Sequence, residues 1–310
     1  MTMDDILEHL LSASIDAVPC PGVVEWWPHY AAAAARWPHP FDLALAGGFA
    51  ADRTGWAFAS GYQAALRALL PDLPDDRICA FCVTEPGGNT PRAVATTLSR
   101  KGAAWSLSGA KRWTTLGPSG ALFVVIARDE EASRDRPVLR AVRVSSDAAG
   151  VHVEAMPETR FVPEVPHAQL RFEDVAVPND ALLGGDAYDL YVKPFRTVED
   201  LHVNAAVMAY LLREARRLGW PRAWIERTLA HLEALRALAA RDPSSSATHL
   251  ALAGALGNAA LLLKEADQHW PGSADDVAAS RWARDRDLLA TASKVREART
   301  QRAWERAAAS

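Results

Sequence analysis

The chain has 310 residues, of which 49% are apolar and 23% are charged, and its formal net charge is −4. This composition is typical of a globular protein with room for two or three domains. The net negative charge argues against a general nucleic-acid-binding protein, which needs a surplus of Lys and Arg facing the phosphates. We expect no membrane-spanning segment, because Arg, Glu or Asp interrupts the Leu- and Ala-rich stretches. The N-terminus, Met1-Thr2-Met3-Asp4-Asp5, is acidic where a signal peptide is basic, so we expect a cytoplasmic protein.

The first third of the sequence predicts helices. Apolar residues recur at the helical period near the start, at Ile6, Leu7, Leu10, Leu11 and Ile15. A second, short helix is expected over residues 31–37, because prolines flank it. A third is expected from about residue 52 to residue 70, where Pro71-Asp72-Leu73-Pro74 ends it. These segments predict a helical N-terminal region.

The middle of the chain predicts short strands. Five segments are either rich in β-branched residues or alternate apolar with polar residues, at 78–83, 122–127, 138–144, 151–155 and 169–173. Short strands separated by Gly, Pro and Ser turns are typical of a small β-barrel or sandwich. The helical period returns at about Tyr188 and predicts four helices, the third over 248–270 and the fourth over 276–308.

The order of these elements predicts an α+β fold. A helical N-terminal region, a central small β-barrel or sandwich and a C-terminal four-helix bundle follow one another along the chain. We place the domain boundaries at residues 1–77, 78–185 and 186–310.

Two of the three cysteines, Cys79 and Cys82, form a single CxxC. A zinc or redox site needs a second pair or a helix N-terminus, and the sequence contains neither near this pair. We therefore expect Cys79, Cys82 and Cys20 to be core side chains, and we expect no metal site.

Three motifs carry the most specific information in the sequence. The first is Phe81-Cys82-Val83-Thr84-Glu85-Pro86-Gly87-Gly88-Asn89-Thr90, and the second is Leu107-Ser108-Gly109-Ala110-Lys111-Arg112-Trp113-Thr114-Thr115. The third is Phe172-Glu173-Asp174-Val175-Ala176-Val177-Pro178, followed by Leu182-Leu183-Gly184. In this order they resemble the signatures of the acyl-CoA dehydrogenase family, and together they cover residues 79–185.

The chemistry of a flavin agrees with this resemblance. A flavin ring is flat and apolar with a polar edge, so it needs an aromatic wall and a few fixed hydrogen-bonding groups. Trp113 can supply the wall, while Thr84, Thr115 and the backbone of Phe81 and Val83 can supply the polar groups. The alternative is a β-hairpin whose Trp and Thr residues pack only against the protein's own core.

The resemblance implies FAD as cofactor, with Thr84, Trp113 and Thr115 in contact with the isoalloxazine ring. It also implies that Thr90 stands where relatives have a serine near the acyl-CoA. The chain is shorter than most family members, and it lacks their Arg-x-x-Phe-Gly and Gln-x-x-Gly-Gly-x-Gly segments.

The catalytic base of the family is a glutamate, usually in a Tyr-Glu-Gly-Thr turn that this sequence lacks. Some members place the base at the start of the first bundle helix, where this chain has Glu199 and Asp200. Glu199 is therefore our candidate base, because α-proton abstraction needs a carboxylate with a raised pKa. The alternative is that both acids stabilise a helix N-terminus. His202 lies nearby, but a lone histidine at such a position is more often a core residue.

These observations favour a FAD-dependent oxidoreductase that catalyses α,β-dehydrogenation of an acyl thioester, carried on CoA or on a carrier protein. A non-catalytic or partner-dependent subunit is one alternative, and a flavin-dependent monooxygenase on the same fold is another. The resemblance also implies a homodimer or homotetramer, whereas the sequence does not indicate the electron acceptor.

Overall fold

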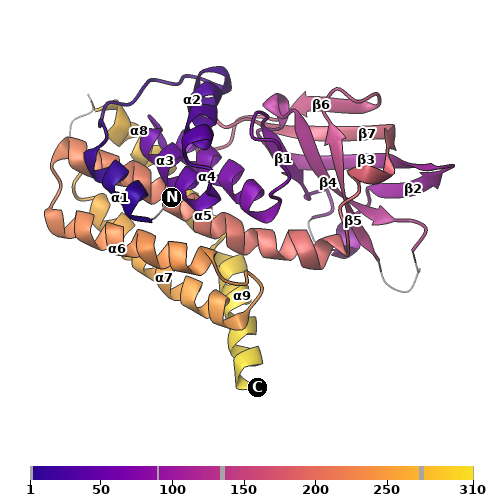
Figure 1. The fold of residues 1–310 in the computed structure, drawn as a ribbon. Helices are drawn as coiled ribbons and strands as arrows, with labels where there is room; N and C mark the ends of the chain where they lie inside the picture. The colour runs from indigo at the N-terminus through magenta and orange to yellow at the C-terminus, as the bar shows by residue number, and fades with distance from the viewer. Residues whose placement is uncertain (1–2, 89–90, 133–136, 272–275, 310) are drawn as a thin grey trace. The chain divides into compact units, whose positions relative to one another are not determined.

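The computed structural model describes residues 3–88, 91–132, 137–271 and 276–309. Helices occupy both ends of the chain and strands occupy the middle, as expected for the α+β class (Figure 1). The chain forms two compact units. The helical unit contains Met1–Ala68, Thr159–Glu164 and Phe195–Ser310, and the β unit contains Leu69–Glu158 and Val165–Pro194. The three-domain boundaries expected from the sequence stay a prediction.

The N-terminal part of the helical unit contains α1 (Met3–Ser12), α2 (Val23–Arg36), α3 (Pro40–Ala50) and α4 (Thr54–Leu69). Helix α2 begins before the expected segment and contains Pro28, one of the prolines that we expected to flank the short helix. A proline inside a helix removes one backbone hydrogen bond, and the packing of Trp26 and Tyr30 in the core offsets that loss.

Helix α3 was not expected from the sequence. Nearly all of its residues are buried, so it has no polar face to produce an amphipathic pattern. Gly48 explains how closely it packs against α5. A Cβ atom at this position would lie 2.1 Å from the Ala206 carbonyl oxygen, so any larger residue would force the two helices apart.

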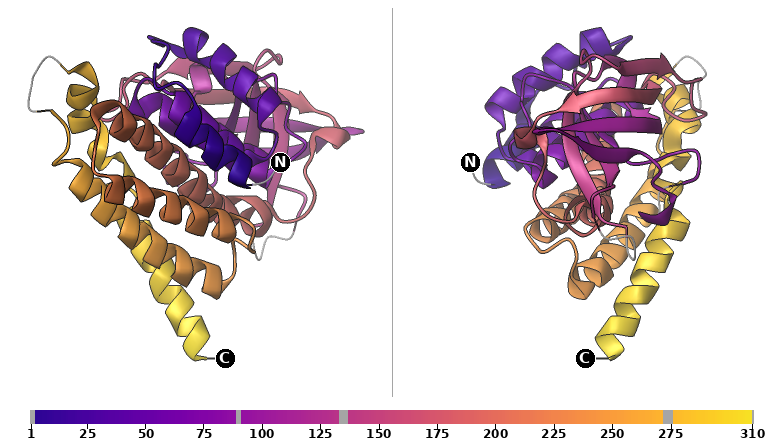
Figure 2. Two further views of the ribbon diagram at one scale, coloured as in Figure 1. Left: turned by 60° about the vertical axis from the view of Figure 1, so that its left-hand side comes forward. Right: turned by 90° about the vertical axis from the view of Figure 1, so that its right-hand side faces the viewer.

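The β unit is built on a single sheet of seven strands. They are β1 (Cys79–Cys82), β2 (Thr97–Lys101), β3 (Ala104–Thr115), β4 (Leu122–Asp129), β5 (Leu139–Ser145), β6 (Val151–Ala155) and β7 (His167–Val177). The strand order is β1-β4-β2-β3-β7-β6, with β5 paired to β4. The right-hand view of Figure 2 shows that this sheet is strongly curved, like part of a barrel. Apolar residues from every strand except β6, among them Leu107, Phe123 and Leu170, form one buried cluster, and Val151 of β6 packs against it.

The thiols of β1 belong to this buried part of the chain. Cys79 and Cys82 are both buried, and each donates to the backbone carbonyl two residues before it, at 3.6 Å. Burial raises the pKa of the Cys82 thiol to about 12, so it stays protonated at neutral pH.

The C-terminal part of the helical unit contains α5 (Lys193–Leu218), α6 (Arg222–Ala239), α7 (Ser246–Ala266), α8 (Val277–Asp285) and α9 (Ser293–Ala308). The expectation of one continuous helix over 276–308 is wrong, because a 3-10 turn at Arg286–Ala290 separates α8 from α9. Tertiary contacts override helix propensity here. Asp285 is tied to the backbone of Val162, while Arg296 on α9 is tied to Asp200 on α5.

Helix α7 differs from what we expected of the apolar stretches in the sequence. Its 21 residues are long and apolar enough to cross a membrane by length and composition, and no charged residue occurs before Lys264. The expectation that charges interrupt every apolar stretch is therefore wrong for this helix. The core helix of a protein without membrane segments passes the same test. Here α7 packs against α6 and α9, and Leu252 and Ala259 are among its buried side chains.

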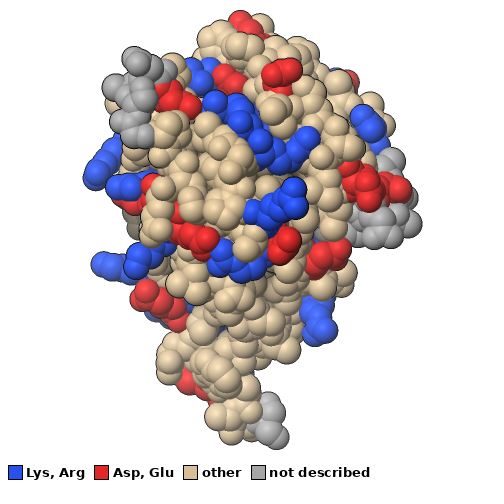
Figure 3. Space-filling model, turned by 90° about the vertical axis from the view of Figure 1, so that its left-hand side faces the viewer, with Lys and Arg blue, Asp and Glu red and all other residues tan. Residues whose placement is uncertain are grey.

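Ion pairs on α8 anchor the segment Thr159–Glu164 within the helical unit. Arg284 bridges Glu164 at 2.9 Å and Asp285 at 2.7 Å. Asp285 is fully buried and also accepts a hydrogen bond of 2.9 Å from the Val162 N–H. On the face of the helical unit that Figure 3 shows, Lys and Arg side chains are intermixed with Asp and Glu.

Candidate functional site

The Thr84-Glu85-Pro86 loop follows β1 and closes as a tight turn. The Glu85 N–H donates to the Gly88 carbonyl oxygen at 3.0 Å, and the Gly88 N–H donates back to Glu85 at 2.9 Å. The Glu85 side chain is directed into the protein, where Lys111 donates to it at 2.6 Å. The backbone N–H groups of Ala95 and Thr96 donate to the same carboxylate, at 2.7 and 3.1 Å.

The charges of Glu85 and Lys111 are almost completely removed from water. The Lys111 side chain is 0% exposed and that of Glu85 is 3% exposed. Burial by itself would raise the pKa of Glu85, but Lys111 and the backbone donors hold it below its usual value. Burial lowers the pKa of Lys111, and Glu85 opposes that change. The sequence contained both residues in neighbouring motifs, and their opposite charges were the signal that could have predicted the pair.

The second motif is joined to the first at Thr96. Gly109 has φ +141°, and a Cβ atom there would lie 2.6 Å from the Thr96 Cα atom. Only glycine allows this approach, through which the Thr96 hydroxyl donates to the Ala110 carbonyl oxygen at 3.3 Å. Gly109 therefore brings β3 close to the chain that follows the Thr84-Glu85-Pro86 loop.

Trp113 is presented to solvent by a β-bulge. The register between β3 and β7 shifts between Lys111 and Thr114, and Trp113 lies in that interval with φ 56°. This conformation is rare for a bulky residue and costs on the order of 1–3 kcal/mol. The side chain is 48% exposed, and the backbone N–H donates to the Met156 sulfur at 3.3 Å. A strained backbone that holds an aromatic ring at the surface is typical of a ligand-binding position.

The structure brings two other predicted flavin residues, Thr84 and Thr115, close to Trp113. The Arg112 N–H donates to the Thr84 carbonyl oxygen at 2.8 Å, so Thr84 lies across one hydrogen bond from the bulge. Thr84 and Thr115 are half-buried, and the Thr115 hydroxyl lies 3.4 Å from Nε2 of His167. Phe81 is buried at 7% exposure in β1, and Val83 is half-buried beside Thr84.

His167 is a member of this group that the sequence did not indicate. Its ring meets Trp113 edge to face, with the ring centres 6.0 Å apart, and its Nε2 atom lies beside Thr115. Burial lowers the pKa of His167, so the ring is neutral at neutral pH. The two predicted residues Trp113 and Thr115 therefore share one neighbour at the start of β7. Thr90, the predicted substrate-binding residue, lies outside the described residues.

The adjacent acids Glu199 and Asp200 lie beyond the first turn of α5, so they are not at its N-terminus, and they have different surroundings. Asp200 is 9% exposed and is held by two arginines of α9. Arg296 donates to it through Nε at 2.9 Å and through Nη2 at 2.7 Å, and Arg299 donates at 2.8 Å. Glu199 is half-buried, and its carboxylate makes no hydrogen bond or ion pair with the residues that the structure describes. Consecutive residues on a helix point about 100° apart, so only one of the two acids faces α9.

This difference affects the acidity of Glu199. Burial raises its pKa to about 7, with a further contribution from the negative charge of Asp200. The positive charges of Arg296 and Arg196 act in the opposite direction. A carboxylate that exchanges its proton near neutral pH is suited to general base catalysis. The predicted base is therefore the acid of the pair without a partner among the described residues.

His202 is a core residue, as we expected for a lone histidine at this position. It is 3% exposed, meets Phe41 edge to face and lies 2.7 Å from the Val198 carbonyl oxygen through Nδ1. Burial lowers the pKa of His202 to about 4, so the ring is neutral.

Comparisons with known proteins agree with the three motifs. Residues 80–175 match the family model of the acyl-CoA dehydrogenase middle domain. This part of the chain, about a third of its length, is therefore similar to the middle domain of acyl-CoA dehydrogenases. The part that matches the family model contains Thr84, Glu85, Gly109, Lys111 and Trp113, and so includes the buried ion pair and the bulge.

Individual known proteins match part of the chain. A 3-sulfinopropanoyl-CoA desulfinase of Paraburkholderia xenovorans is 33% identical over 102 residues, which cover 33% of this chain and 26% of the relative. A benzylmalonyl-CoA dehydrogenase of Aromatoleum aromaticum is 28% identical over 144 residues, which cover 46% of this chain and 37% of the relative. The match thus spans only about a quarter to somewhat more than a third of the length of these relatives.

The fold extends the likeness beyond the middle domain. The crystal structure of glutaryl-CoA dehydrogenase from Mycobacterium smegmatis matches with a TM-score of 0.66 at 15% identity. The match covers 97% of this chain and 92% of that chain. At this identity the likeness establishes the fold alone.

Proposed function

We propose that this chain is a FAD-dependent oxidoreductase of the acyl-CoA dehydrogenase family that introduces a double bond between the α and β carbons of an acyl thioester. The observation that carries the proposal is Trp113, whose ring a strained β-bulge holds half-exposed within the family's middle domain. A core hairpin would bury such a ring, because a large aromatic side chain gains most when water is removed from it.

The residues of the β unit fit a flavin ring. Trp113 offers an aromatic face, Thr84 and Thr115 offer hydroxyl groups, and the backbone of Phe81 and Val83 offers further donors and acceptors. Glu85 and Lys111 hold the two motif segments together from the buried side. The chemistry that bound FAD supplies is the acceptance of a hydride from the β carbon.

Glu199 is the proposed base for the α proton. Its raised pKa, about 7, leaves a substantial deprotonated fraction at neutral pH and gives the carboxylate a strong tendency to take up a proton. In the step we propose, the α C–H bond breaks, the proton moves to the Glu199 carboxylate, and the C–H electron pair forms the new double bond as the β-hydride leaves.

The substrate class and assembly follow from the family in this proposal. The names of both curated relatives contain a CoA thioester, and one of the two denotes a desulfinase, so the thioester is better supported than dehydrogenation itself. We propose an acyl-CoA or acyl-carrier thioester as substrate, with Thr90 near it. We also propose a cytoplasmic homodimer or homotetramer with a separate electron acceptor.

Flavin binding can be tested without any turnover. Equilibrium dialysis of the purified chain against FAD should give a weaker complex for Trp113→Ala than for the unaltered chain, by about tenfold or more if the ring is a stacking wall. Trp304→Ala is the matched control, because Trp304 is 60% exposed on α9, outside the β unit. Equal affinities for both variants would remove Trp113 from the flavin site.

The base can be tested through proton exchange. An acyl-CoA deuterated at the α carbon should lose deuterium to water in the presence of the FAD-loaded chain, and Glu199→Gln should abolish this loss. Glu226→Gln, at an exposed position on α6, should leave it unchanged. Exchange that persists in Glu199→Gln would exclude Glu199 as the base. A chain that binds FAD without any α exchange would favour the monooxygenase or the non-catalytic subunit.

A further inference from the structure

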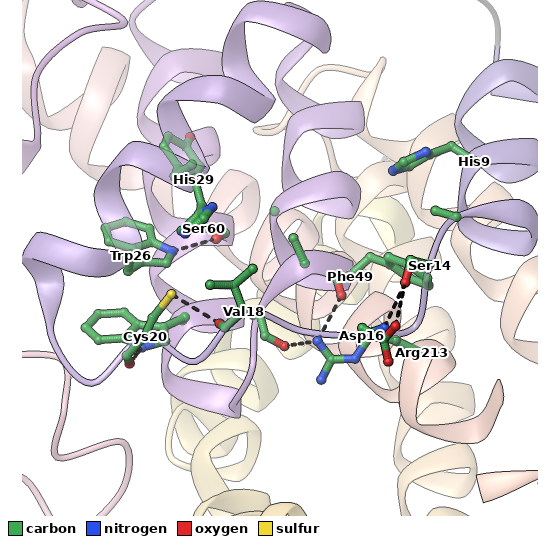
Figure 4. A pocket seen from close by; sticks show the side chains of 16 residues that line it. His9, Ser14, Asp16, Val18, Cys20, Trp26, His29, Phe49, Ser60 and Arg213 are labelled. Atoms are coloured by element: carbon green, nitrogen blue, oxygen red, sulfur yellow. Dashed lines mark hydrogen bonds between the residues drawn. The ribbon is translucent and has the colours of Figure 1, made fainter. Parts of the chain in front are cut away.

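A separate cavity of about 260 Å³ lies within the helical unit, and it contains none of the residues assigned above to flavin or base (Figure 4). Helices α1 to α5 all contribute to its wall, and residues 14–20 cross its opening. Ser14, Asp16 and Val18 of this crossing segment are exposed, so the cavity communicates with solvent beside them.

One end of the cavity is aromatic. Trp26 and Trp56 stack with ring centres 5.3 Å apart and an angle of 11°, and Tyr30 lies 5.3 Å from Trp26. The indole N–H groups are already engaged, that of Trp26 with the Ser60 hydroxyl at 3.3 Å and that of Trp56 with the Cys20 carbonyl at 2.6 Å. This end therefore offers apolar ring surface and little demand for new hydrogen bonds.

The other end of the cavity is basic. Figure 4 shows Arg213, Phe49 and His9 at the end opposite to Trp26 and Ser60. Arg213 is 2% exposed and donates to the backbone carbonyls of Phe49 and Ala51 and to Glu214. Its Nε atom is buried and has no acceptor among the described residues. A buried N–H of an arginine without an acceptor is costly, and an anion is the group that satisfies it best.

Positive charge around His9 strengthens this asymmetry. Arg216 donates to the Leu10 carbonyl at 2.7 Å and lies over the Phe49 ring, and Arg36 lies over the Trp37 ring. No carboxylate forms an ion pair with either arginine in the part of the chain that the structure describes. Burial lowers the pKa of His9, and Arg36 and Arg216 lower it further, as expected in a locally positive field. Asp16, the acid at the opening, bonds instead to Ser14 at 3.2 Å.

Size and chemistry restrict what this cavity can hold. Its volume is below the about 300–1,000 Å³ of sites for drug-sized ligands, so a dinucleotide or a complete acyl-CoA is too large. Burial raises the pKa of Cys20 at its wall, so the thiol is protonated and unreactive at neutral pH. The wall thus favours reversible binding of a compact ligand with one flat apolar end and one acidic end.

We propose that this cavity is a binding site for a small aromatic carboxylate. Its ring lies at the end formed by Trp26 and Trp56, and its carboxylate accepts a hydrogen bond from Nε of Arg213 near His9. This site is independent of the proposed flavin chemistry, because every residue of its wall belongs to the helical unit.

The test is a titration of the full purified chain with phenylacetate. Binding is measured by calorimetry and by the total tryptophan fluorescence, to which Trp26 and Trp56 contribute. Phenylacetamide is the matched neutral ligand. We expect saturable binding of phenylacetate with a Kd at least about tenfold lower than that of phenylacetamide, because a hydrogen bond to a charged group is the stronger kind. Equal affinity for the two, or no saturable binding of phenylacetate, would overturn the proposal.

Variants locate the binding within the chain. Ala50→Phe places a bulky ring at an exposed position of the cavity wall and should weaken phenylacetate binding at least about tenfold. Ala35→Phe, at an exposed position of α2 outside the wall, should leave it unchanged. If Ala50→Phe melts at a clearly lower temperature than the unaltered chain, Val18→Trp at the opening of the cavity serves as the blocking variant instead. Unchanged binding in the folded blocking variant would overturn the assignment to this cavity.

Discussion

The buried pair Glu85–Lys111 allows a sharp test of how the β unit is held together. Lys111→Met removes the ammonium group and keeps an unbranched side chain of similar length, so little packing is lost. The Glu85 carboxylate, 3% exposed, is then left without its cation at 2.6 Å. Breaking a buried ion pair by removal of one partner destabilises a protein by about 3–5 kcal/mol.

The structure places the expected loss at the lower end of this range. Glu85 keeps the N–H donors of Ala95 and Thr96, at 2.7 and 3.1 Å, so part of its charge remains satisfied. We therefore expect Lys111→Met to lower the free energy of unfolding by about 3 kcal/mol in urea denaturation. The matched control is Lys101→Met, which breaks the exposed pair Lys101–Asp174 in the same sheet. That control should change stability little, because exposed ion pairs are well solvated.

A double variant separates charge from packing. Glu85→Gln combined with Lys111→Met leaves no unpaired charge, so it should be less destabilised than the sum of the single variants, by about 0.5–3 kcal/mol. A loss for Lys111→Met no larger than that of Lys101→Met would refute the reasoning. Strict additivity of the two single variants would do the same.

Two further predictions concern the helical unit. Gly48→Ala should destabilise the protein by about 1–3 kcal/mol in urea denaturation, because its Cβ would meet the Ala206 carbonyl at 2.1 Å. Gly257→Ala on α7, where the Cβ meets nothing within 4 Å, should stabilise the protein by about 0.5–1 kcal/mol. A Gly48→Ala variant that is more stable than Gly257→Ala would contradict the close packing of α3. The folded chain raises the pKa of Glu199 to about 7, so between about pH 4.5 and that value it holds a proton that the unfolded chain has released. Relative to Glu199→Gln, the unaltered chain should therefore lose stability as the pH rises through this window, and parallel stability curves would show that the pKa is not raised.

The sequence predicted five of the seven strands, because these alternate apolar and polar residues or are rich in β-branched ones, whereas β2 and β3 were not among the expected segments. Phe123 and Val125 in β4 and Leu170 and Phe172 in β7 show these patterns and lie in the core. Helix α3 could not be predicted in the same way, since burial on all sides erases the amphipathic period on which the prediction depends. Helix α7 was misjudged for a different reason, because its charges begin only near its end.

The candidate site was predictable only where it is local in sequence. Thr84 and Trp113 belong to motifs, and a hydrogen bond from Arg112 to Thr84 joins these motifs in the structure. The difference between Glu199 and Asp200 depends on Arg296 and Arg299, almost a hundred residues further along the chain. No pattern in the sequence indicates which acid those arginines neutralise, because that choice depends on how α9 packs in the helical unit.

The central claim is that the chain binds FAD and reduces it with an acyl thioester. The measurement that tests it most directly is the visible absorbance spectrum of the purified, FAD-loaded chain during anaerobic titration with acyl-CoA. The proposal predicts a flavin spectrum that bleaches on addition of substrate, and a Glu199→Gln variant that keeps the flavin and does not bleach. A chain that takes up no flavin, or a loaded chain that stays yellow with every acyl-CoA tested, would contradict it.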